Sequence, residues 1–168
     1  MNDEIKNRVA NSKLITLDLE DYYPKGDRII FDISQWLVDG LFLREKEFRE
    51  QVKNHNWSQY KDSYIAMRCS TDAIIPAWAY MLLTVNLTPF AKKVTVGTLK
   101  ELEIILFTEF ISQLKLSEYK NRSVIIKGCS HYPIPKNAFI LLTQKLQPVV
   151  KSLMYGEACS SVPIYKKK

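Results

Sequence analysis

The residues of this chain best suited to chemistry are its three cysteines. They are Cys69, Cys129 and Cys159, and each is followed directly by a serine. Each also has a proline a few residues downstream, so all three lie in stretches that read as rigid loops. This placement is unusual, because free cysteines are mostly packed within core elements. A thiolate in an accessible loop can act as a nucleophile or bind a metal.

Two kinds of metal site fit these residues. The three thiolates with His131 as a fourth ligand would satisfy tetrahedral zinc. Three thiolates alone could hold an iron–sulfur cluster with one open iron. The cysteines are 60 and 30 residues apart, so no short Cys-x-x-Cys framework supports either cofactor. Both hypotheses therefore require a fold that brings the sulfur atoms together.

A metal-free reactive thiol is the second kind of chemistry. Cys69 is the candidate nucleophile, because Arg68 beside it supplies a cation that favours the thiolate. Asp72 and Lys127 complete the set of candidate catalytic residues, as acid–base or supporting groups. The remaining alternative is a non-catalytic binding or interaction module, in which the cysteines have no chemistry and only fit tight strand-to-helix turns.

The start of the helix after Cys69 bears on its reactivity. Asp72 could cap a helix that begins at Ala73, or Pro76 could occupy the first helical position. In the second case Cys69 lies too far upstream to be activated by the helix dipole, which fades within one turn. The sequence leaves both positions open.

Strands and helices alternate from residue 63 onward. The strands are expected at Tyr64–Arg68, Lys93–Val96 and Ser123–Lys127, and the helices at 78–85, 99–114 and 135–146. Thr98 and Glu101 form a capping box for the second of these helices. Residues 149–154 fit a helical period better than that of a strand, although a final strand remains an alternative.

The N-terminal part shows a different pattern. Leu14–Leu19 and Arg28–Ile33 read as two strands, and the turn residues at 24–27 between them predict an antiparallel hairpin. A short helix is expected near residues 35–38, capped by Asp32 or Ser34. A longer helix is expected from residue 41, because apolar residues recur at helical spacing beside a mixed-charge face.

These elements predict the α/β fold class. We expect a single layered domain over residues 1–168, with a mixed, mostly parallel sheet flanked by helices and an N-terminal antiparallel hairpin. The sequence shows no internal repeat. Ligands of such sheets bind outside the carboxyl ends of the strands. Cys69 and Cys129 both follow predicted strands, so this edge is where the candidate site is expected.

Composition limits the classes of partner. The net charge is +6, but Lys166, Lys167 and Lys168 supply half of it, so a nucleic-acid partner is not favoured over a solvated tail. No apolar run approaches the roughly 20 residues that span a bilayer. The polar start of the chain is unlike a signal peptide, which predicts a cytoplasmic protein. The expected partner is a small molecule or a metal.

Several strings together resemble a family of small bacterial proteins of unknown function, number 2480 in that series. They are NRVANS, LDLEDYYP, REKEFRE, WSQY, CSTDAIIPAWAYM, VIIKGCS and KSLMYGEACSSVPIYK, and they are spread over nearly the whole chain. The resemblance implies a bacterial, cytoplasmic setting. It implies no activity and no catalytic residue, so the candidate site depends on the residues themselves.

Overall fold

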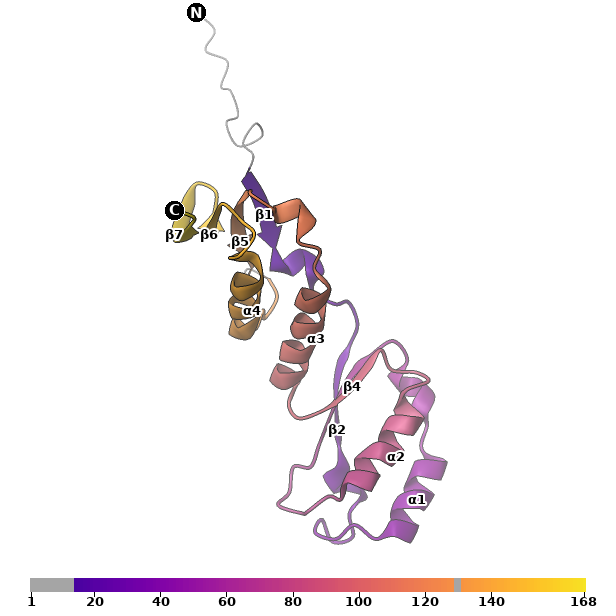
Figure 1. Ribbon diagram of the computed structural model, residues 1–168. Helices are drawn as coiled ribbons and strands as arrows, with labels where there is room; N and C mark the ends of the chain where they lie inside the picture. Colours follow the sequence, from indigo (N-terminus) through magenta and orange to yellow (C-terminus); the bar gives the residue numbers. More distant parts are fainter. Residues whose placement is uncertain (1–13, 129–130) are drawn as a thin grey trace, which may run out of the picture. The chain divides into compact units, whose positions relative to one another are not determined.

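The computed structural model describes residues 14–128 and 131–168, and the chain divides into two compact units. Unit 2 comprises Lys25–Glu103, and unit 1 comprises the flanking segments up to Pro24 and from Ile104. Figure 1 shows the elements of each unit. The boundary falls within helix α3 (Leu99–Gln113). That the two units act as a single domain stays a prediction.

Unit 2 contains a three-stranded, fully parallel sheet in the order β2-β3-β4. Its strands are β2 (Arg28–Asp32), β3 (Tyr64–Arg68) and β4 (Lys93–Val96), and its helices are α1 (Glu45–Asn54), α2 (Ala77–Leu87) and the 3₁₀ turns η2 (Ile33–Trp36) and η3 (Trp57–Tyr60). Alternate side chains of a strand face the same side. Ile65 and Met67 of β3 share one core cluster with Phe48 of α1 and Leu83 of α2, so both helices cover that face.

Unit 1 contains a four-stranded sheet in the order β1-β5-β6-β7. Its strands are β1 (Leu14–Asp18), β5 (Ser123–Lys127), β6 (Ser152–Glu157) and β7 (Ser160–Lys166), and its helices are most of α3, α4 (Lys136–Leu146) and the 3₁₀ turns η1 (Leu19–Tyr22) and η4 (Ser117–Tyr119). The first three strands are parallel, and β7 returns antiparallel to β6. A single cluster of buried residues from β1, β5, α3 and α4 forms the core.

The two units repeat one arrangement, in contrast to the sequence-based expectation of no repeat. Helix α2 and strand β3 recur 59 positions later as α4 and β5, with identical lengths. Buried core residues recur at the same spacing: Phe48 and Phe107, Val52 and Ile111, Tyr60 and Tyr119, Ile65 and Val124, Met67 and Ile126, Ala79 and Ala138, Leu83 and Leu142, Leu87 and Leu146. Unit 2 therefore repeats the arrangement of unit 1 and lies, in the sequence, between the two segments that form unit 1.

Unusual backbone conformations recur at this spacing as well. Asp62 and Asn121 both adopt left-handed conformations, with φ of 60° and 56°. The Asp62 amide donates to the Phe90 carbonyl at 3.0 Å, and the Asn121 amide donates to the Val149 carbonyl at 2.8 Å. Gly97, after β4, and its counterpart Gly156 have φ of 130° and 110°, a region that favours glycine. The match thus extends from the core to individual turns.

The predicted α/β class and mostly parallel pairing are confirmed, as are the bounds of β3, β4 and β5. The N-terminal hairpin is wrong, because β1 pairs with β5 and β2 pairs with β3, both in parallel. The antiparallel hairpin of the fold is β6–β7 instead. The helix favoured for 149–154 is also wrong, since β6 begins at Ser152 and pairs along β5. The i, i+4 spacing of Ile5 and Val9 predicts a further short helix in the first dozen residues, and this prediction lies outside the described residues.

Candidate functional site

Asp32 organises the carboxyl edge of the unit 2 sheet. It ends β2, and its Oδ1 accepts hydrogen bonds from the backbone N–H of Ser34 and of Ser70, both at 3.1 Å. The first bond caps η2, and the second holds the loop that follows β3. The two serine hydroxyls lie 2.9 Å apart, and the Arg68 guanidinium lies 4.0 Å from Asp32 Oδ2. The predicted cap at Asp32 is confirmed.

The environment of Asp32 keeps it ionised. Partial burial raises the pKa of this carboxyl, but hydrogen bonds from Ser70 and Ser34 outweigh burial and lower the pKa from 3.8 to about 2. A carboxylate that accepts several backbone and hydroxyl hydrogen bonds is stabilised in its charged form. Asp32 is therefore a fixed anion and not a proton donor near neutral pH.

Cys69 lies directly beyond the carboxyl end of β3 and is partly exposed. Its Sγ lies 3.3 Å from the Thr71 hydroxyl. Burial raises the pKa of Tyr80 on α2, and the charge that Cys69 would carry as a thiolate raises it further. Helix α2 begins at Ala77 with Pro76 as its N-cap. Asp72 is therefore not the helix cap, and Cys69 is too far upstream for activation by the dipole.

The equivalent edge of unit 1 carries a related ion pair. Asp18 ends β1 and caps η1, as Asp32 does in unit 2. In the strand register Lys127 of β5 lies beside Asp18, as Arg68 lies beside Asp32. Lys127 Nζ is 3.2 Å from Asp18 Oδ2 and 3.3 Å from Glu157 Oε1 of β6. Hydrogen bonds to these carboxylates raise the pKa of Lys127, which disfavours it as a general base.

His131 is held by Glu20 of η1. The His131 amide donates to Glu20 Oε1 at 2.8 Å, and its Nδ1 lies 3.2 Å from Glu20 Oε2. The imidazole itself is largely exposed. The carboxylate partner was not anticipated from the sequence, because the two residues are more than a hundred positions apart.

The three cysteines have different settings. Cys69 belongs to unit 2, and Cys159 lies exposed in the turn between β6 and β7 of unit 1. Cys129 lies outside the described residues. Within residues 14–128 and 131–168, no cluster of three or more metal-ligating side chains is present. The described part of the chain therefore adds no support to a shared metal site.

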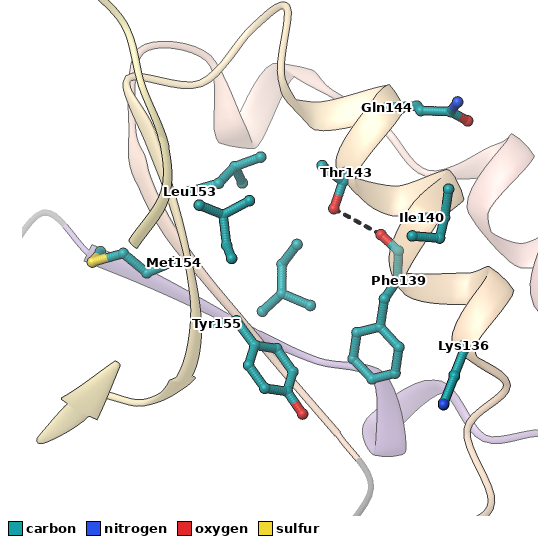
Figure 2. Close-up of a pocket in the computed structure, with 10 residues that line it drawn as sticks. Lys136, Phe139, Ile140, Thr143, Gln144, Leu153, Met154 and Tyr155 are labelled. Atoms are coloured by element: carbon teal, nitrogen blue, oxygen red, sulfur yellow. Dashed lines mark hydrogen bonds between the residues drawn. The ribbon is translucent and has the colours of Figure 1, made fainter. Parts of the chain in front are cut away.

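A groove in unit 1 is a site that the sequence did not reveal. This α4–β6 groove has a volume of about 570 Å³. Its walls come from α4, β5, β6 and β7: Ile126, Lys136, Phe139, Ile140, Thr143, Gln144, Leu153, Met154, Tyr155 and Ile164. The rings of Phe139 and Tyr155 meet edge to face, with centroids 5.7 Å apart. Figure 2 shows Lys136 and Tyr155 at one end of this groove and Gln144 at the other.

Unit 2 carries a second groove at equivalent positions. This α2–β4 groove, of about 400 Å³, is lined by Met67, Tyr80, Met81, Thr84, Val85, Val94, Thr95 and Val96. Each of these residues precedes a lining residue of the α4–β6 groove by 59 positions. Two differences matter. Positions 136 and 155 carry a lysine and a tyrosine, where unit 2 has Ala77 and Val96. In the part of the chain that the structure describes, a strand like β7 borders the unit 1 groove alone.

Comparison with known proteins identifies the family. The model of the family described as protein of unknown function (DUF2480) matches residues 3–167, and the chain belongs to this family. No curated protein and no solved structure matches the chain. Among the described helices, none combines the length and the apolar character needed to cross a membrane.

Proposed function

We propose that this DUF2480 protein is a non-catalytic binding protein that takes up an amphipathic small molecule in the α4–β6 groove. The ligand would have an apolar body and an anionic or hydrogen-bond-accepting head. One observation carries the proposal: a groove of about 570 Å³ with a largely apolar wall and polar groups of Lys136 and Tyr155 at one end. Apolar concave sites with a few directed polar groups are typical of small-molecule binding.

The wall of the groove favours an apolar body. Ile140 is 58 % exposed, so burying it under a ligand would remove apolar area from water. Thr143 adds no free donor, because its hydroxyl already donates to the Phe139 carbonyl at 2.7 Å. The head of the ligand would lie at the end of the groove that carries Lys136 and Tyr155. There the Lys136 ammonium attracts an anion, and the Tyr155 hydroxyl can donate a hydrogen bond.

Titration calorimetry with straight-chain carboxylates tests this function. Each added methylene is expected to tighten binding about fourfold, since its burial contributes about 0.8 kcal/mol. The alcohol of equal length should bind more weakly, and Lys136→Ala should remove the difference between the two. Ile140→Asp should abolish binding, whereas Met81→Asp, at the equivalent position of unit 2, should leave it unchanged. Absence of binding over the whole series, or binding indifferent to Ile140→Asp, would reject the proposal.

A second candidate function is thiol chemistry at the strand ends, favoured by the partly exposed Cys69 beyond β3. In this proposal Cys69 is the nucleophile and Asp72 and Lys127 are supporting residues. In the related metal proposal, the protein binds zinc or an iron–sulfur cluster through four candidate ligands: Cys69, Cys129, Cys159 and His131. Both forms place the protein in the cytoplasm, where thiols stay reduced.

Metal analysis of freshly purified protein, with an anaerobic absorption spectrum, tests the metal form. Stoichiometric zinc or iron that is lost in Cys69→Ser, Cys129→Ser and Cys159→Ser supports it. The reactive-thiol form predicts that one thiol is alkylated faster than the other two and that Cys69→Ser removes this fast phase. Metal-free protein with equal, slow labelling of all three thiols would exclude both forms.

A further inference from the structure

The outer edge of β4 lies beside an apolar surface. In the described residues, β4 pairs only with β3, so alternate backbone N–H and C=O groups point away from the sheet. Strand β4 is short and begins with Lys93, but the three residues that follow, Val94-Thr95-Val96, carry neither a proline nor a charge. Natural edge strands usually carry such protection against pairing. The Val94–Val96 stretch carries no such residue and is therefore suited to pairing with another strand.

Exposed apolar side chains lie beside this edge. Met81 and Val85, one turn apart on α2, are 67 % and 69 % exposed, and Val96 of β4 is 53 % exposed. All three line the α2–β4 groove. Three large apolar side chains exposed around one groove are typical of a surface that another protein covers.

The repeat shows how an equivalent edge is closed. In unit 1 the counterpart of β4 is β6, and β7 pairs antiparallel with its outer edge. Ile164 of β7 borders the groove at that edge. The outermost strand β7 contains Pro163 and a bulge, which are devices that prevent further pairing. Among the described residues no strand takes the place of β7 in unit 2, because Gly97 leads directly into α3 whereas Gly156 leads into the hairpin.

We propose that β4 and the α2–β4 groove form the dimer interface of this protein, where the β4 strands of two copies pair antiparallel about a two-fold axis at Thr95. In this register Val94 of one copy lies opposite Val96 of the other. Lys93 lies opposite Gly97, against which the Glu101 carboxylate is packed. The Lys93 ammonium of each copy therefore lies near the Glu101 carboxylate of the other, which gives two such pairs of opposite charges across the axis. This self-complementarity selects a second copy of the chain as the occupant.

Glu101 is well placed for this role. It closes the capping box of α3, accepting hydrogen bonds from the Thr98 amide at 2.7 Å and hydroxyl at 2.9 Å. These bonds lower the pKa of Glu101, so it is charged near neutral pH. The confirmed capping box thus fixes an anion at the point where the Lys93 ammonium of the other copy would arrive.

Sedimentation equilibrium of the full chain measures the predicted association. The expected mass is twice the 19.5 kDa of the chain. Met81→Asp and Val85→Asp should each weaken the dimer at least tenfold, because a charge would be buried at the interface. The matched control Ile140→Asp changes the equivalent position of unit 1 and should leave the dimer intact. Lys93→Glu should weaken the dimer most at low salt, since it places like charges together.

A cross-link tests the register independently of affinity. With Thr95→Cys, the two copies place their thiols directly opposite, within the Cα separation that a disulfide accepts. Mild oxidation should therefore link position 95 to position 95, identified by mass spectrometry. Lys93→Cys should not link to itself, because four residues separate these positions across the axis.

Three results would overturn the proposal: a monomer at all concentrations, a dimer that survives both charge substitutions on α2, or equal cross-linking from positions 93 and 95. The ligand proposal is tested separately. Met81→Asp is expected to remove the dimer and keep ligand binding, whereas Ile140→Asp is expected to do the reverse. Failure of one proposal is therefore distinguishable from failure of the other.

Discussion

Asp32 and Ser70 are joined by a hydrogen bond of 3.1 Å, in which the Ser70 backbone N–H donates to Oδ1 of the Asp32 carboxylate. Asp32 ends β2, and Ser70 follows Cys69 in the loop after β3. The bond therefore fastens the loop that contains Cys69 to the end of the neighbouring strand β2. The same oxygen also caps η2 through Ser34, so one side chain holds two turns.

Asp32→Ala should destabilise the protein by about 1–2 kcal/mol, because it removes the cap of η2 and the anchor of the Ser70 amide. Urea denaturation at neutral pH measures this change. Asp72→Ala, at an exposed position of the same loop, is the control and should change stability by less than about 0.5 kcal/mol. Equal effects of the two substitutions would show that Asp32 does not have this role.

The contribution of Asp32 should also depend on pH. Its pKa is about 2 in the folded protein and near 3.8 when unperturbed, so the folded state favours the charged form. This stabilisation is present above pH 3.8 and is lost as the pH falls toward 2. After solvent screening it amounts to roughly 1 kcal/mol. The difference in unfolding free energy between wild type and Asp32→Asn should shrink over this range, and a constant difference would contradict the assignment.

The helices and strands with a regular hydrophobic pattern could be located from the sequence, but the pairing of the strands could not. Strand β3 was placed from a local pattern, because its buried run is bounded by turn residues. The hairpin expected for β1 and β2 was inferred from the turn between them. Strand β1 pairs instead with β5, which begins more than a hundred residues later. Local turn chemistry carries no information on such a distant partner.

The repeat and the groove were missed for different reasons. The repeat does have a sequence signal, because five of the eight core pairs, such as Tyr60 with Tyr119, are identical at the constant spacing of 59 positions. This signal lies in a long-range spacing and not in a local hydrophobic pattern. The groove had no usable signal. Ile140 and Tyr155 come from a helix and a strand, and their meeting depends on packing of the fold. The cysteines, in contrast, could be selected as candidates because thiol chemistry follows from the residue type alone.

Equivalent core substitutions should have equivalent, local effects. Leu83 and Leu142 occupy the same position of the repeat, and both are fully buried. Leu83→Ala and Leu142→Ala should each cost about 2–5 kcal/mol through lost burial and the cavity left behind. In native-state hydrogen exchange, each variant should lose protection mainly within its own unit. Uniform loss across both units would instead indicate one cooperative core and support the single-domain prediction.

The ion pair of Arg28 and Glu103 within unit 2 tests how much stability is lost when one of two buried charges is removed. Arg28 Nε lies 2.6 Å from Glu103 Oε1, with side chains only 13 % and 9 % exposed. The guanidinium also lies 4.9 Å from the Tyr64 ring centroid and donates to the Gly26 carbonyl at 2.6 Å. Removing one partner leaves the other charge with poor solvation, so Glu103→Ala should cost about 3–5 kcal/mol.

Replacing both partners should be milder than removing one. Arg28→Met combined with Glu103→Leu keeps the packing and buries no charge, so its unfolding free energy in urea should lie within about 2 kcal/mol of wild type. Glu45→Ala is the control for an exposed pair, because Glu45 lies 2.9 Å from Arg49 with both side chains more than half exposed. That substitution should cost less than about 0.5 kcal/mol. A double variant less stable than Glu103→Ala would show that the pair itself stabilises the start of β2, beyond the cost of its desolvation.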